Sequence, residues 1–215
     1  MRTLFIEAKY KEKIELDKNI INKLPKNIGL VTTVQFTDQL KDIKKQLEKQ
    51  NKKVFIGKGR QKYEGQILGC DYSAAEKIKN NVDCFLYIGS GQFHPLGLKT
   101  DKRIFNFNPL TKEFREFTKK EIEEYKKRRK GAYLKFLTAK NIGIIVSTKP
   151  GQYQLKKAIE LKNKLKKQEK DAYLFIADDI DINQLENFPF IECWVNTACP
   201  RITEDKKGVI NVEEL

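Results

Sequence analysis

The feature that most constrains the fold is a regular alternation of short apolar runs with lysine-rich helical stretches. Runs such as CFLYIG and IGIIV have the length and composition of core β-strands, and they are too short to cross a membrane. Between them lie amphipathic stretches such as LKDIKKQLEKQNKK, in which apolar residues recur at helical spacing. Strands and helices in alternation predict mostly parallel sheets flanked by helices and joined by right-handed crossovers. The predicted fold class is therefore α/β.

Two segments of the chain resemble each other, which predicts two similar domains in tandem. Each segment begins Asn-Ile-Gly, continues as an apolar strand ending in Ser/Thr-Thr, enters a lysine-rich helix and returns as an aliphatic strand. A cysteine then follows in each half, Cys70 in the first and Cys199 in the second. We therefore predict domains at residues 9–112 and 140–215, joined by a helical connection over residues 113–139.

The apolar stretch TLFIEA, within residues 1–8, precedes the first repeat and has no counterpart in the second. It is either an edge strand of the first sheet or the last strand of a preceding domain. The repeat pattern alone does not distinguish these two possibilities.

The chain is strongly basic, and its charge is dispersed. The formal net charge is +14, and the lysines are spread along helices and interleaved with glutamate, as in KKEIEEYKKRRK. A solvated helix surface explains this pattern better than a nucleic-acid interface does, although an acidic protein partner would also be attracted. Because the N-terminus turns charged at once, unlike a signal peptide, we expect a soluble cytoplasmic protein with no membrane association.

The four cysteines fall into two kinds. Cys84 and Cys193 lie within strand-like runs among large apolar residues, where a thiol usually packs as a small hydrophobic group. Cys70 and Cys199 instead follow such runs, where the chain leaves the carboxyl end of a strand, and open α/β sheets bind ligands at that edge. No CxxC pair occurs in the sequence, so a metal site would be assembled from distant segments. From spacing alone, the two thiols are either ligands of one zinc or iron–sulfur site or unrelated.

Two further turns offer small and polar groups at the same type of edge. Gly89, Ser90 and Gly91 follow the strand CFLYIG, and closely spaced glycines let backbone amides approach an anionic group. Ser147 and Gln152 lie in the turn VSTKPGQ, which follows a strand of the second half. Both turns are candidate binding loops.

His94 is the only histidine, and a proline follows it, so we expect a structural turn residue. No GxSxG elbow, Walker loop or HExxH motif occurs in the sequence. The usual hydrolase and nucleotide-triphosphatase sites are therefore excluded.

Four stretches taken together, GQILGCDYSAA, YIGSGQFHPLGL, VSTKPGQ and WVNTACPRI, resemble the archaeal 2-(3-amino-3-carboxypropyl)histidine synthases, the diphthamide synthase family, in order and approximate spacing. The resemblance spans residues 28–202. It implies a fold of three similar α/β domains, each giving one cysteine to a central 4Fe–4S cluster. On this resemblance Cys70 is the ligand from the second domain and Cys199 the ligand from the third, with the cluster at the cleft between the domains.

The first domain of the family, with its own cysteine, has no counterpart in the sequence. The resemblance implies that residues 1–8 are the last strand of that domain. Neither Cys84 nor Cys193 lies at a family ligand position. We therefore expect either that a separate first-domain polypeptide supplies the third thiolate or that the chain does not work alone.

The resemblance also implies the chemistry. Three cysteines leave one iron of the cluster open for S-adenosylmethionine, whose cleavage gives a 3-amino-3-carboxypropyl radical. This radical attacks C2 of a histidine in elongation factor 2, the protein substrate, in the first step of diphthamide biosynthesis. Gly89, Ser90, Gly91, Ser147 and Gln152 are the expected adenosylmethionine-binding residues.

Because the reacting imidazole belongs to the partner protein, His94 has no required catalytic role. A homodimer is a further expected assembly. Two alternatives stay open: an accessory subunit that binds without redox chemistry, and a basic α/β module that binds nucleic acid.

Overall fold

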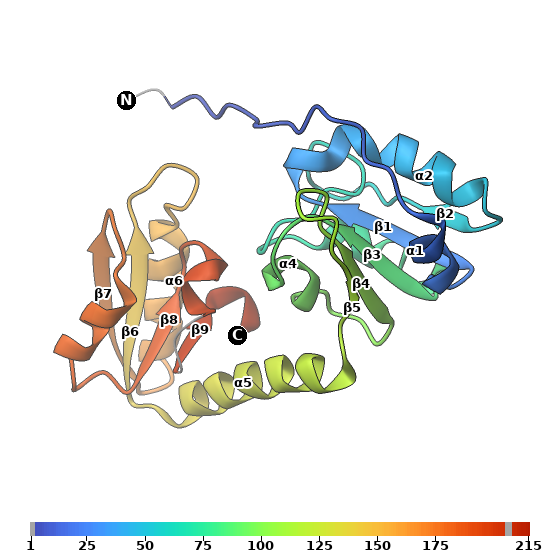
Figure 1. Ribbon diagram of the computed structural model, residues 1–215. Coiled ribbons are helices and arrows are strands. Elements are labelled where there is room, and N and C mark those ends of the chain that lie inside the picture. Colours follow the sequence, from blue (N-terminus) through green and yellow to red (C-terminus); the bar gives the residue numbers. More distant parts are fainter. Residues whose placement is uncertain (1–2, 205–207) are drawn as a thin grey trace. The chain divides into compact units, whose positions relative to one another are not determined.

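The structure is a computed structural model that describes residues 3–204 and 208–215 (Figure 1). The chain divides into two compact units, Met1–Ile122 and Glu123–Leu215. Each unit is built on one mostly parallel sheet with helices beside it, which confirms the predicted α/β class. Among the described residues, no helix is both long enough and apolar enough to span a bilayer.

The sheet of the first unit has the strand order β2-β1-β3-β4-β5, with β5 antiparallel to β4 and the other pairs parallel. Its strands are β1 Asn27–Thr32, β2 Lys53–Phe55, β3 Cys84–Ile88, β4 Arg103–Phe107 and β5 Phe114–Glu116. Its helices are α1 Lys18–Lys23, η1 Val34–Gln39, α2 Leu40–Glu48, α3 Ser73–Glu76, η2 Lys79–Asn81 and α4 Phe93–Leu96. The long helix α5, Lys119–Thr138, begins in this unit and continues into the second.

The sheet of the second unit has the order β7-β6-β8-β9, and all its pairs are parallel. Its strands are β6 Asn141–Ser147, β7 Asp171–Ala177, β8 Cys193–Asn196 and β9 Val209–Asn211. Its helices besides α5 are α6 Leu155–Lys166, η3 Ile182–Asn187, η4 Pro200–Thr203 and η5 Val212–Glu214.

The two sheets repeat one arrangement, in which the first strand lies between the second and third strands of its unit. The Asn-Ile-Gly motif has the same structural role in both. Gly29 lies directly beside Phe85 in the neighbouring strand, and Gly143 lies beside Trp194. A Cβ atom added to Gly29 would come within 2.8 Å of the Phe85 ring, and one added to Gly143 within 2.4 Å of the Trp194 ring. The ring covers the glycine, so the position excludes a larger residue.

Each sheet is covered on one face by an amphipathic helix that follows its first strand. In the first unit Ile28 and Leu30 of β1 pack in one cluster with Ile43 and Leu47 of α2. In the second unit the strands form a cluster with α5 and α6. Figure 1 shows α6 against one face of this sheet. The other face of the second sheet carries a smaller cluster that includes Ile145 and Trp194, so apolar side chains are buried on both faces, as is usual for a parallel sheet.

Several elements differ from the sequence expectation. The stretch GQILG, expected as a strand, forms an isolated parallel bridge between Gln66 and Thr32 at the end of β1. The turn at His94 is a short helix, α4. The strands β5 and β9 were not predicted, because neither three-residue strand contains an apolar run long enough to indicate one.

The N-terminal residues 3–8 belong to no strand, and Met1 and Arg2 of the predicted strand lie outside the described residues. The side chains of Leu4, Phe5 and Ile6 are exposed. The edge-strand alternative for the first sheet is therefore wrong. That the stretch completes a sheet of another domain stays a prediction.

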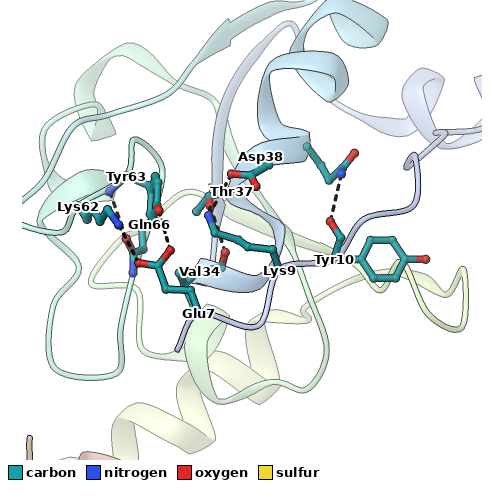
Figure 2. Close-up of polar contacts among 10 residues, drawn as sticks. Glu7, Lys9, Tyr10, Val34, Thr37, Asp38, Lys62, Tyr63 and Gln66 are labelled. Carbon is teal, nitrogen blue, oxygen red and sulfur yellow. Dashed lines mark hydrogen bonds and ion pairs between the residues drawn. The ribbon is translucent and has the colours of Figure 1, made fainter. Parts of the chain in front are cut away.

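Beyond residue 6 the chain is fixed to the first unit by side-chain contacts (Figure 2). The Glu7 carboxylate accepts hydrogen bonds from the Tyr63 hydroxyl at 2.6 Å and from the Lys62 ammonium at 3.2 Å. The Lys9 ammonium lies 3.0 Å from the Asp38 carboxylate and 3.6 Å from the centre of the Tyr63 ring. These contacts hold Glu7 and Lys9, where the apolar stretch ends, at the surface of the unit.

We predict that Gly143→Ala destabilises the second unit by about 1–3 kcal/mol, because the added methyl group must displace the Trp194 ring from its place against β6. Urea unfolding followed by Trp194 fluorescence measures this loss. Gly131→Ala in α5 is the control, since nothing lies within 4 Å of its added Cβ. It should be neutral or stabilising by up to about 1 kcal/mol. Equal effects of the two substitutions would contradict the packing argument.

Candidate functional site

Cys70 lies at the carboxyl edge of the first sheet. The Thr32 N–H donates to the Gly65 carbonyl at 2.9 Å, and the Ile67 N–H donates to the Thr32 carbonyl at 2.8 Å. The chain before Cys70 thus runs beside the carboxyl end of β1. The Cys70 side chain is exposed.

The Gly89–Gly91 turn follows β3 at this same edge, and the structure brings it near the Cys70 loop. Phe93, two residues after the turn, packs against Gly69. A Cβ atom added to Gly69 would lie 2.4 Å from the Phe93 ring. Gly91 has a φ of 71°, in the region that favours glycine, and nothing lies within 4 Å of the position its Cβ would take. The turn therefore offers an open main-chain surface beside the Cys70 loop.

A buried carboxylate holds the Cys70 loop in place. Asp71 is buried, and its carboxylate accepts hydrogen bonds from Arg60 at 3.0 Å, Gln61 at 2.7 Å and the Ser73 N–H at 3.0 Å. Burial alone would raise the pKa of Asp71, but these hydrogen bonds outweigh it and lower the pKa well below its usual range. The exposed Arg60 guanidinium interacts electrostatically with Cys70. Sequence reasoning identified neither Asp71 nor Arg60, although the acidic residue directly after Cys70 was a signal for the role of Asp71.

Cys199 follows β8 at the carboxyl edge of the second sheet, on a loop fixed by buried amides. The Asn196 side-chain amide donates to the Cys199 carbonyl at 2.9 Å and to Asn211 Oδ1 at 2.8 Å. The Asn196 Oδ1 accepts from the Ala198 N–H at 3.0 Å. The Asn211 amide in turn donates to the Thr203 hydroxyl at 2.8 Å. This network leaves Cys199 half-buried at the start of η4.

The turn after β6 lies at the same edge, since β6 and β8 are adjacent parallel strands. Ser147 is buried, and its hydroxyl donates to the Asp178 carbonyl at 3.2 Å and accepts from the Lys149 N–H at 3.2 Å. The Gln152 N–H donates to the Lys149 carbonyl at 3.0 Å, and its side chain is half-buried. Ser147 thus shapes the turn, while the main chain around Gln152 is closer to solvent.

His94 is half-buried and packs among aromatic rings. Its ring lies 5.1 Å from that of Phe93 and 6.0 Å from that of Tyr87, and its Nδ1 lies 3.5 Å from the Tyr87 hydroxyl. Burial raises the pKa of Tyr87 to about 12. These surroundings accord with the predicted structural role of His94.

Cys84 and Cys193 are core residues, as predicted. Both are fully buried in the central strands, β3 and β8. Burial raises the pKa of the Cys84 thiol to about 12 and that of the Cys193 thiol to about 11, so neither is a ready source of thiolate.

The cysteines do not share a place in the repeat, which corrects one expectation. Cys70 lies between β2 and α3, whereas Cys199 follows β8, the counterpart of β3. The sequence did not reveal this difference, because both cysteines follow a stretch that contains strand-forming residues. Within the described ranges, 3–204 and 208–215, no group of three His, Cys, Asp or Glu side chains could hold a metal ion.

Comparison with known proteins identifies the family. A family model described as "Putative diphthamide synthesis protein" matches residues 1–212. The chain belongs to the diphthamide synthesis protein family.

Members of the family with assigned names are similar over most of the chain. The chain is 39% identical to 2-(3-amino-3-carboxypropyl)histidine synthase of Pyrococcus horikoshii, over 96% of the chain and 60% of that relative. It is 31% identical to the synthase of Methanocaldococcus jannaschii, over 100% of the chain and 61% of that relative. The chain therefore spans about three-fifths of the length of these relatives.

A solved structure of the family has the same fold. The chain matches a crystal structure of Dph2 from Pyrococcus horikoshii with a 4Fe–4S cluster. The match has a TM-score of 0.76 and 38% sequence identity, over 91% of the chain and 58% of that structure.

We predict that iodoacetamide labels Cys70 and Cys199 in the native chain at least about tenfold faster than it labels Cys84 and Cys193, because burial disfavours both access and the thiolate form. Mass spectrometry of timed samples measures the four rates, and labelling in denaturant is the control. A fast native reaction at Cys84 or Cys193 would contradict the assignment to the core.

We predict that Asp71→Asn lowers the free energy of unfolding by about 1–3 kcal/mol near neutral pH, because it removes charge-assisted hydrogen bonds to a buried group. The folded-state pKa of Asp71 lies below its unfolded value, so this contribution is present above the unfolded pKa and is lost as the pH falls. Urea unfolding at about pH 6 and about pH 3 should therefore show a smaller difference from wild type at the acidic pH. The exposed carboxylate of Asp38 supplies the control, Asp38→Asn.

Proposed function

We propose that this chain is part of a radical transferase that moves the 3-amino-3-carboxypropyl group from S-adenosylmethionine to C2 of a histidine in elongation factor 2. The observation that carries the proposal is the position of Cys70 and Cys199. Each lies at the carboxyl edge of its sheet, and the chain resembles named synthases over nearly its whole length. The relatives' activity is carried to this chain as an inference, because the chain spans about three-fifths of their length.

The donor atoms of the two sites suit an iron–sulfur cluster. Cys70 is exposed and Cys199 is half-buried, and hydrogen bonds of Asp71 and Asn196 fix their loops before any metal binds. Thiolates on preformed loops are the ligands that such clusters require. We propose Cys70 and Cys199 as ligands of one 4Fe–4S cluster.

The third thiolate of a three-cysteine site comes from outside these 215 residues, since Cys84 and Cys193 lie in the core. We propose that a separate first-domain polypeptide supplies it. The exposed residues Leu4, Phe5 and Ile6 support this idea, because an apolar extended segment can add a strand to another sheet.

When bound, the reduced cluster supplies the electron that breaks the bond between sulfur and the γ-carbon of S-adenosylmethionine. The protein residues position and shield the reactants. The Gly89–Gly91 turn comes just before Phe93, which packs on Gly69 of the Cys70 loop, and its amides suit the carboxylate or ribose of the co-substrate. Ser147 and Gln152 shape the corresponding turn of the second unit. We propose these five residues as co-substrate contacts.

Anaerobic reconstitution of the chain together with a first-domain polypeptide of a relative tests the proposal. We expect iron–sulfur absorbance and cleavage of S-adenosylmethionine that depends on a reductant. Cys70→Ala and Cys199→Ala should each abolish both, whereas Cys193→Ala, at a core position, should retain the cluster. A cluster that survives the loss of either Cys70 or Cys199 would refute the ligand assignment. Binding of elongation factor without cleavage would indicate an accessory subunit instead.

A further inference from the structure

One segment of this basic protein has the opposite charge. Residues 171–200 contain no lysine or arginine, although the chain has 43 of them. The same residues include acidic side chains that are all exposed: Asp171, Asp178, Asp179, Asp181, Glu186 and Glu192. A solvated surface typical of this chain would carry lysines here as it does elsewhere, so this region has a distinct surface chemistry.

The segment includes the unpaired edge of the second sheet. Strand β7 is the end strand in the order β7-β6-β8-β9. The Asp171 N–H donates to the Lys140 carbonyl, and the Ala177 carbonyl accepts from the Thr148 N–H. The main-chain groups of these two residues therefore face β6. Because main-chain groups alternate in direction along a strand, those of residues 172, 174 and 176 face away from β6. An edge of this kind can accept another strand.

Natural proteins commonly protect such an edge with lysine, proline or a bulge. Strand β7, with the sequence DAYLFIA, contains neither lysine nor proline. It pairs with β6 in unbroken register over its full length, from Asp171 to Ala177. The strand is therefore regular and open to pairing.

The face of the sheet beside this edge is thinly covered. Trp194 and Ile145 form a small cluster there, and residues 180–188 complete it with side chains that are only partly buried. On this face the large side chains of Tyr173 and Phe190 are exposed, and their rings meet edge to face at 5.3 Å, so the exposed apolar atoms of these two residues are contiguous. Ile176 is also exposed, but its side chain lies on the opposite face of the strand, with those of Ala172 and Leu174. Contiguous exposed apolar surface on a soluble protein is typical of an interface.

The charges around the patch indicate the partner. Two lysines that adjoin the segment, one by contact and one in sequence, are already engaged: Lys149 pairs with Asp179, and the Lys170 ammonium donates to main-chain oxygens at the end of α5. Residues 171–200 carry six carboxylates and no lysine or arginine, and this acidic segment disfavours nucleic acid and anionic lipid. A second copy that pairs through the same patch would bring two acidic sets together, which is unfavourable.

We propose that β7 and residues 178–190, the acidic–apolar patch, form a docking surface for another protein. The partner segment is extended and flanked by lysine or arginine, and as an added strand its alternate apolar side chains cover Tyr173 and Phe190 on one face and Ile176 on the other. Main-chain pairing with the edge of β7 gives affinity, and the carboxylates select a cationic segment. This proposal does not depend on the proposed transferase function.

A synthetic peptide with a short run of valine flanked on both sides by lysine is the probe, and the same peptide with glutamate in place of lysine is its control. Trp194, the only tryptophan, reports binding to the full chain by fluorescence, because its ring lies 4.6 Å from that of Phe175 in β7. We expect saturable binding of the lysine peptide that weakens as salt is added, and no binding of the glutamate peptide. Amide NMR signals of Ala172, Leu174 and Ile176 should shift on binding.

Ile176→Lys should weaken binding at least about tenfold, because it places a cation in the patch and removes apolar contact. Leu110→Lys in the first unit is the matched control, since Leu110 is 58% exposed and Ile176 is 52% exposed, and it should bind as wild type does. Phe190→Lys serves as a second test if Ile176→Lys does not fold. Circular dichroism verifies the fold of each variant.

Three results would overturn the proposal. The lysine peptide fails to bind, or both peptides bind equally, or the patch and control variants bind alike. Sedimentation analysis adds a fourth: self-association of the wild-type chain that Ile176→Lys abolishes would assign the patch to a second copy.

Discussion

The loops that carry the candidate ligands depend on close contact between a glycine in one strand and an aromatic ring in the next. Gly29 under Phe85 fixes the pairing of β1 with β3, and Gly143 under Trp194 fixes that of β6 with β8. The candidate turns after β3 and β6 and the Cys199 loop after β8 start from the carboxyl ends of these strands, and the Cys70 loop, which follows β2, runs beside the carboxyl end of β1. An aromatic ring packed on a glycine restricts the two strands to one pairing register, because a shift of one residue would place a side chain under the ring.

The two units fix their cysteine loops by different means. In the first, a buried carboxylate, Asp71, gathers donors from Arg60 and Gln61. In the second, the neutral amides of Asn196 and Asn211 form a chain of hydrogen bonds. A carboxylate is sensitive to acid and an amide is not, so the loop of the first unit is the more sensitive to pH.

Sequence reasoning could predict what depends on apolar periodicity and local spacing. The strands around Cys84 and Cys193, the helix at 119–138 and the core role of both cysteines follow from runs of neighbouring residues. Arg60 could not be predicted as a partner of Asp71, because their contact depends on how an irregular loop folds back. The open edge of β7 could not be predicted either. The order of strands in a sheet depends on tertiary packing, and the apolar residues of one strand do not indicate its neighbours.

The unequal placement of Cys70 and Cys199 bears on how the chain originated. Both halves share a strand order and the Asn-Ile-Gly motif, as descendants of one ancestral unit would. Yet one cysteine precedes the third strand of its half and the other follows the counterpart of that strand. Residues in different connections of a repeat are not copies of one ancestral residue. The two thiols therefore do not descend from a single ancestral cysteine, and the ligand positions changed independently of the scaffold that holds them.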